Sequence, residues 1–176
     1  VRRMRESFAA TSRDASCELA SRRLAMGLAN AATKLGPEAV KDIVSLGQTV
    51  ASSAGVDDVA MRVGIELVAC CAEEVDEAES TRRRALAQSC SSLTDGVLNM
   101  ASQVFKAAGG ASTKERDALR ASCVRACHRW LKLDPSGDVG GGLSMSPTQL
   151  AVAHGELFAN VLNCLAVESS GCGAAA

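Results

Sequence analysis

The sequence predicts an all-α protein. It is rich in alanine, leucine and valine, and among its 176 residues it has no tyrosine, one tryptophan, three phenylalanines and three prolines. Alanine and leucine favour helices, whereas the aromatic residues that favour strands are nearly missing. Apolar residues also recur at the spacing of one helix face through most of the chain. A chain of this length is expected to form one domain with a hydrophobic core.

Three amphipathic helices are predicted in the first half of the chain. The first covers about residues 16–35 and ends at Gly36. The second begins at Pro37, a residue that suits the first helical position, and ends near Ala54. Asp57 can cap the third. Their apolar stripes are, in order, Leu24, Leu28, Ala31 and Leu35; Val40, Ile43, Val44, Gly47 and Val50; and Val59, Val63, Leu67 and Cys70.

A longer helix is predicted next, from about Thr81 to Ala108, where the pair Gly109-Gly110 ends it. Ser112 and Glu115 have the spacing of a capping box for the following helix, which ends near Leu133. The long helix and its successor are expected to pack as an antiparallel pair, because the link between them is short. The apolar stripe of the long helix is Leu86, Cys90, Leu93, Val97, Ala101 and Val104.

The last predicted helix begins at Ser146 and Pro147, after a glycine-rich loop, and its apolar stripe reaches Leu165. Six or seven helices result, and successive pairs recur at roughly the 40-residue spacing of HEAT-type repeats. We therefore predict an α-α superhelix of HEAT-like antiparallel helix pairs over residues 1–168, belonging to a longer protein. Residues 169–176 are expected to be a disordered tail.

Charge, hydropathy and cysteine placement make several classes of function unexpected. The net charge of −1 gives no overall attraction to nucleic acid or to an acidic membrane, so direct nucleic-acid binding is not expected. No apolar run is long enough to cross a bilayer, so membrane insertion is not expected. Seven of the eight cysteines fall at apolar positions of predicted helices, where free thiols pack as small hydrophobes, and only Cys172 lies in the tail. This placement favours a reduced, intracellular setting.

The segment "RACHRWLKLD", residues 125–134, is the strongest candidate for a chemical site. Cys123 and Cys127 lie one helical turn apart, and His128 follows them. A structural zinc site needs four ligands, usually from knuckles in turns, and no second pair of ligands has matching spacing. Both cysteines share a stripe with Leu119 and Trp130. We therefore expect these side chains, including Trp130, to be buried in the core, and we expect no metal and no cofactor.

Catalysis is not expected either. A nucleophilic Cys or Ser needs a base and a group that orients that base. The only histidines are His128, which abuts arginines, and His154, which has only Glu156 as an acid on its turn. The loop "DVGGGLS" lacks the pattern and the preceding strand of a phosphate-binding loop. We therefore predict that the protein is not an enzyme.

An acidic stretch lies before three consecutive arginines, Arg82 to Arg84. The helix macrodipole disfavours acids at a helix C-terminus, so this placement costs some stability. Two interpretations remain open: a solvated loop, or a ridge that binds a basic partner. The candidate partner-binding residues are Glu73, Glu74, Asp76, Glu77 and Glu79.

The order of features resembles the importin-β (karyopherin) superfamily, with the transportin-SR branch closest. The stretches that carry the resemblance are "RRLAMGLANAA", "IELVACCAEEV", "TRRRALAQSCSSL", "RWLKL" and "LFANVLNCL". They cover roughly residues 22–165. Ala72 stands where the family usually has a proline before the two acids, and Arg129 stands where a small residue normally precedes the tryptophan.

The resemblance implies a segment of a nuclear transport receptor, importin or exportin, built from HEAT or armadillo-like helical repeats. Such receptors shuttle between nucleus and cytoplasm, bind protein cargo and respond to the GTP-bound form of the small GTPase Ran. A monomer is expected. Two alternatives stay open: a HEAT-like scaffold unrelated to transport, and a small helical-bundle protein that binds metal through its cysteines.

Overall fold

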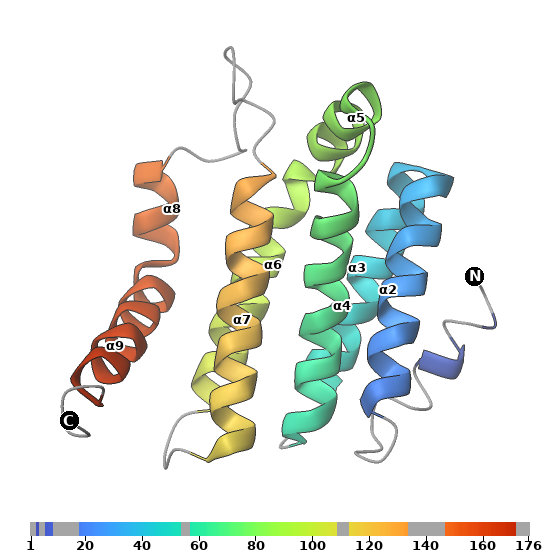
Figure 1. The fold of residues 1–176 in the computed structure, drawn as a ribbon. Helices are drawn as coiled ribbons and strands as arrows, with labels where there is room; N and C mark the ends of the chain where they lie inside the picture. Colours follow the sequence, from blue (N-terminus) through green and yellow to red (C-terminus); the bar gives the residue numbers. More distant parts are fainter. Residues whose placement is uncertain are drawn as a thin grey trace.

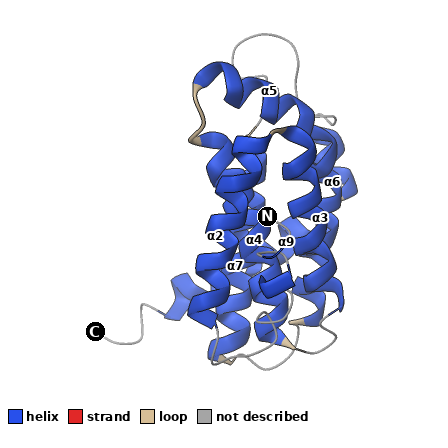
Figure 2. Cartoon of the chain, turned by 90° about the vertical axis from the view of Figure 1, so that its right-hand side faces the viewer, coloured by secondary structure: helices blue, strands red, loops and turns tan. Residues whose placement is uncertain are grey.

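The computed structural model describes residues 3, 6–8, 18–53, 57–108, 113–133 and 147–171, and it confirms the all-α prediction. Every regular element in these residues is a helix (Figure 2). A short 3-10 helix, η2 (Ser91–Leu93), joins two of the α-helices. The α-helices are α2 (Glu18–Leu35), α3 (Pro37–Ser53), α4 (Asp58–Asp76), α5 (Ser80–Cys90), α6 (Thr94–Ala107), α7 (Lys114–Lys132), α8 (Pro147–Ala153) and α9 (Gly155–Gly171).

The long helices form two layers. In the first, α2 and α7 flank α4 on either side, and in the second α3 packs against α6 (Figure 1). The long helices α2, α3, α4, α6 and α7 therefore alternate between the layers, and each runs antiparallel to the long helix before it (Figure 1). The predicted antiparallel pairing of the helix ending near residue 108 with its successor is present as α6 and α7, which pack together. A superhelical winding of these pairs stays a prediction.

The central helix of the fold is α4. All seven residues from Val63 to Ala69 are buried, because α4 packs against α2, α3 and α7. It crosses α3 where Gly47 faces Gly64. A Cβ atom on Gly64 would lie 2.6 Å from the carbonyl oxygen of Gly47 and 2.7 Å from the backbone nitrogen of Ala51. Because neither helix has a side chain at this crossing, the two backbones can approach closely.

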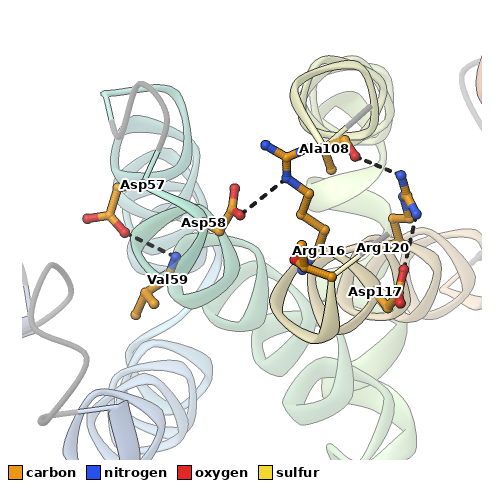
Figure 3. Close-up of polar contacts among 8 residues, drawn as sticks. Asp57, Asp58, Val59, Ala108, Arg116, Asp117 and Arg120 are labelled. Atoms are coloured by element: carbon orange, nitrogen blue, oxygen red, sulfur yellow. Dashed lines mark hydrogen bonds and ion pairs between the residues drawn. The ribbon is translucent and has the colours of Figure 1, made fainter. Parts of the chain in front are cut away.

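The predicted helix boundaries in the first half are confirmed. Gly36 ends α2 with a φ of 119°, a left-handed conformation that glycine adopts without a steric penalty, and Pro37 begins α3. Asp57 caps α4, since its Oδ1 accepts hydrogen bonds from the backbone nitrogens of Val59 and Ala60, both at 3.1 Å (Figure 3). The predicted stripe of α3 is buried throughout. In the stripes predicted for these three helices, Leu35 is 67% exposed at the end of α2, and a further four residues are partly buried: Leu24, Ala31, Val59 and Cys70.

The prediction of one continuous helix over residues 81–108 is wrong. η2 divides it into α5 and α6, and α5 turns away from the direction of α6 (Figure 1). Serine hydroxyls compete with the backbone for helical hydrogen bonds, and here Ser91 Oγ donates to the carbonyl oxygen of Gln88 at 2.8 Å. The apolar spacing continues across the break, so periodicity alone could not reveal it.

The start of α7 and the course of the last helix also differ in detail from the prediction. Thr113 caps α7 by accepting a hydrogen bond from the backbone nitrogen of Arg116 at 3.3 Å, whereas Ser112 lies outside the described residues. The last predicted helix is divided at His154. Eight α-helices are therefore present in the described residues, where six or seven were predicted.

The end of the chain is helical for longer than predicted. α9 continues to Gly171, whereas the sequence predicts a tail from residue 169, and residues 172–176 lie outside the described part. Among the residues that the structure describes, no helix combines the length and the apolar character required to span a membrane.

We predict that Gly64→Ala lowers the free energy of unfolding by about 1 to 3 kcal/mol or more, because the new methyl group would overlap backbone atoms of α3. Gly96→Ala in α6 is the matched control: its Cβ would meet only the flexible Gln48 side chain, at 3.1 Å. Since alanine favours a helix more than glycine does, the control variant should be at least as stable as the parent. Urea unfolding measures both, and a Gly64→Ala variant as stable as the Gly96→Ala variant would contradict the close crossing.

Candidate partner-binding surface

The structure places the five acidic residues of the predicted ridge in two different environments. Glu73, Glu74 and Asp76 belong to the last turns of α4 and are partly buried. Glu77, at the C-terminal cap of α4, and Glu79, at the N-terminal cap of α5, are exposed. Because α4 extends to Asp76, the acidic stretch is mostly helical and does not face solvent as a single group.

The three partly buried acids are paired within the chain. Glu73 lies 3.3 Å from Arg129 Nε on α7, and Glu74 accepts a hydrogen bond of 2.7 Å from Asn30 Nδ2 on α2. Asp76 binds two cations, Lys132 Nζ of α7 at 2.7 Å and Arg83 of α5 at 2.8 Å. These side chains therefore join α4 to its neighbours, and neutralising them is expected to weaken the fold. The sequence alone had indicated only a cost to stability from these acids, because they lie at a helix C-terminus.

A fourth acid, Glu66, lies at the middle of α4, where the residue is only 7% exposed. Its Oε1 accepts a hydrogen bond of 2.8 Å from Ser122 Oγ and lies 3.8 Å from Arg22 Nη2, and its Oε2 is paired with Arg125 of α7. A buried carboxylate without such partners would be strongly destabilising. Glu66 therefore joins the middle of α4 to the middle of α7 and to the N-terminal part of α2.

These pairs fix the register of the first layer. Lys132 follows Asp76 by 56 positions and Ser122 follows Glu66 by 56 positions, while Asn30 precedes Glu74 by 44. A nearly constant separation means that the paired helices run parallel, as Figure 1 shows for α2, α4 and α7. We call these interhelical contacts the polar ladder; its acidic members are Asp58, Glu66, Glu73, Glu74 and Asp76, and its partners are Arg116, Ser122, Arg125, Arg129, Lys132, Arg22 and Asn30.

Arginines also secure the ends of helices. Asp58, at the start of α4, lies 3.7 Å from Arg116 Nε of α7 (Figure 3). Arg120 of α7 donates from Nη2 to the carbonyl oxygen of Ala108 at 2.7 Å, beside the C-terminus of α6. Arg82 of α5 does the same for α2, donating to the carbonyl oxygen of Thr33 at 2.8 Å. Cations at these positions satisfy carbonyl groups that the helix itself leaves free.

Sequence reasoning missed Glu66 and its partners, although two indications were present. Glu66 is the only charged residue between Val63 and Ala72, a stretch that is otherwise apolar or small, and such a residue needs a partner when buried. Arg125, Arg129 and Lys132 also recur at the spacing of one helix face. Those two patterns could have suggested that α4 and α7 lie side by side.

The segment around Trp130 is part of the core, as predicted. Trp130 is 1% exposed, and its Nε1 donates to the backbone oxygen of Val68 on α4 at 3.0 Å. Cys123 and Cys127 are buried, whereas His128 is exposed. Burial raises the pKa of the Cys127 thiol to about 12 and raises the pKa of Cys123 as well, so both thiols are protonated at neutral pH. Neither thiol therefore resembles an activated nucleophile.

His154, the other candidate base, lies in the core and pairs with an aspartate. The side chain of His154 is buried, and its Nε2 lies 2.9 Å from Oδ1 of Asp95 on α6, a partner that the sequence did not indicate. In the part of the chain that the structure describes, no three His, Cys, Asp or Glu side chains gather into a metal site.

What remains open to a partner at the predicted ridge is the exposed pair Glu77 and Glu79, which form no ion pair with the described residues.

Comparison with known proteins returned no family model, curated protein or solved structure that matches this chain. Membership of the importin-β superfamily therefore stays a prediction from the order of sequence features. The contacts of the candidate surface are electrostatic, and most of them are pairs within the chain.

We predict that Asp76→Asn lowers stability at neutral pH and flattens its decline in acid. The hydrogen bond from Lys132 lowers the pKa of Asp76, partial burial opposes this effect, and the hydrogen bond from Arg83 adds to the lowering. A carboxylate with a lower pKa in the folded state stabilises the fold above its unfolded pKa, and this contribution is lost as the pH falls through its folded pKa.

Urea unfolding from roughly pH 7 to roughly pH 3 measures this effect. Glu77→Gln is the control, because Glu77 is a neighbouring acid that is exposed and forms no ion pair with the described residues. The two variants should differ at neutral pH and converge in acid. If their unfolding free energies stayed equal over the whole range, the assigned role of Asp76 would be wrong.

Proposed function

We propose that this chain is a protein-binding segment of a nuclear transport receptor, working in nucleus and cytoplasm with protein cargo and GTP-bound Ran. The observation that carries the proposal is the alternation of long helices between two layers, each antiparallel to the one before it (Figure 1). This is the arrangement expected of stacked helix pairs, whose repeats contact only their neighbours. The order of sequence features from residue 22 to residue 165 supports the same conclusion.

The geometry also suits a receptor that changes shape. The helices of the first layer are linked by ion pairs and hydrogen bonds at the rim of the interface, over a buried apolar seam. Small changes between neighbouring helix pairs add up along a stack, so that a ligand bound at one place can alter the curvature elsewhere. A binding protein of this kind needs no catalytic residues of its own, because Ran supplies the GTPase activity.

Within this proposal, Glu77 and Glu79 form the contact for a basic partner. They are the exposed members of the predicted ridge, whereas Glu73, Glu74 and Asp76 are engaged within the chain. Exposed charges of this kind affect the rate and selectivity of association more than they affect stability. A basic face of Ran and an arginine-rich cargo segment both have the complementary charge.

The test is a binding titration of the full chain against Ran loaded with GTP or GDP, and against an arginine-rich peptide, at low and high salt. We expect preference for GTP-bound Ran. We also expect that Glu77→Gln/Glu79→Gln weakens binding of the basic partner at low salt, and that the difference shrinks at high salt because screening suppresses exposed charges.

The control variant, Glu115→Gln/Asp117→Asn, removes the same formal charge from the start of α7, at the opposite end of the layer from the ridge (Figure 1). It should bind as the parent does. If neither form of Ran binds, the transport proposal fails and the chain is a helical scaffold of another kind. If Ran binds but the Glu77/Glu79 variant and the control are indistinguishable, the ridge is a solvated link with no part in binding.

A further inference from the structure

The described side chains of α8 and α9 make few contacts with the rest of the protein. This segment packs chiefly against α6. Among its described side chains only His154 and Leu157 are buried, whereas Val152 is 82% exposed and Leu162 is 65% exposed. In α4, by contrast, nearly every side chain along the middle of the helix is buried. Segments with few buried apolar contacts open with a low free-energy cost.

The buried side chains of this segment lie at the start of α9, which packs against α6. Leu157 is completely buried. Three positions earlier in the chain, His154 Nε2 lies 2.9 Å from Asp95 Oδ1. Asn99 Nδ2 donates to the other oxygen of the same carboxylate at 3.1 Å and so holds it in place. The remaining ion pair, Lys106 to Glu156 at 2.8 Å, has both side chains more than half exposed and contributes little.

We infer that α8 and α9 open from α6 as a unit of their own while α2 to α7 stay folded, with Leu157 and the His154–Asp95 contact as the latch. His154 stands at the junction of the two helices, and its carbonyl oxygen accepts a hydrogen bond from the backbone nitrogen of Phe158 at 3.2 Å. His154 therefore also contributes its backbone to the junction between α8 and α9. Most of the stability of a helix in a protein comes from the packing of one of its faces, so α9 loses its helical hydrogen bonds more readily once it is undocked.

Opening uncovers the apolar surface of α6 that Leu157 covers in the closed form. The two-layer body does not depend on this contact, because α4 makes its interfaces with α2, α3 and α7. In the closed form the segment covers part of α6. In the open form the apolar surface of α6 is exposed at one edge of the two-layer body. This inference concerns the fold itself and does not depend on the proposed transport function.

Hydrogen–deuterium exchange on the full chain tests the latch, with the amides of α9 from Phe158 to Asn163 as the reporter and those of α4 as the reference. In the parent, the α9 amides should exchange faster than those of α4. His154→Ala and Leu157→Ala should each speed up exchange in α9 by roughly tenfold or more and leave α4 unchanged, because a partly buried hydrogen bond or a buried leucine is lost. Glu156→Gln, the control, should change exchange in α9 by about twofold at most.

A double variant distinguishes loss of the His154–Asp95 contact from a general decrease in the stability of α9. If His154 acts through Asp95, then His154→Ala combined with Asp95→Ala should accelerate exchange in α9 no more than either change alone. The inference is overturned if α9 and α4 exchange at one common rate and accelerate together, since the chain would then be a single cooperative unit. It is also overturned if α9 keeps the parent rate in both latch variants.

Discussion

The close crossing of α3 and α4 at Gly47 and Gly64 is the constraint on which the rest of the structure depends. Two helices approach this closely only where both lack a side chain at the crossing point. The approach brings the apolar stripe of α3 against α4, and α2 and α7 then cover the two flanks of α4. Since α4 packs against α2 and α7 in its own layer and against α3 in the other, a shift at this crossing would disturb the packing of both layers.

The polar ladder has a different role from the apolar core. Partly exposed ion pairs such as Glu73 with Arg129 add little stability, because water and salt screen them. Their positions nevertheless discriminate between registers, since sliding α7 by one turn would leave Glu66 buried without its arginine and serine. The core therefore provides most of the stability, while the ladder selects the parallel alignment.

Much of the fold could be predicted from the sequence because its determinants are local. The caps at Gly36 and Asp57 and the burial of Trp130 follow from short patterns, and all three are present. The break at η2 could not be predicted, because the apolar spacing runs through it unbroken. At the candidate site the acids between Glu73 and Glu79 were identified from the sequence, whereas Glu66 and the environment of these acids were not. The partners of Glu74 and Asp76 lie 44 and 56 positions away, and only the tertiary packing brings them together.

The most direct test of this account is a charge swap across the ladder at Glu73 and Arg129, measured as the free energy of unfolding at low salt. Glu73→Arg alone and Arg129→Glu alone should each destabilise the protein, because each places like charges on neighbouring helices. If α4 and α7 run parallel in the register described, the double variant restores the ion pair with its polarity reversed and recovers most of the loss. A double variant whose loss equals the sum of the two single losses would contradict the parallel register on which the account of the first layer rests.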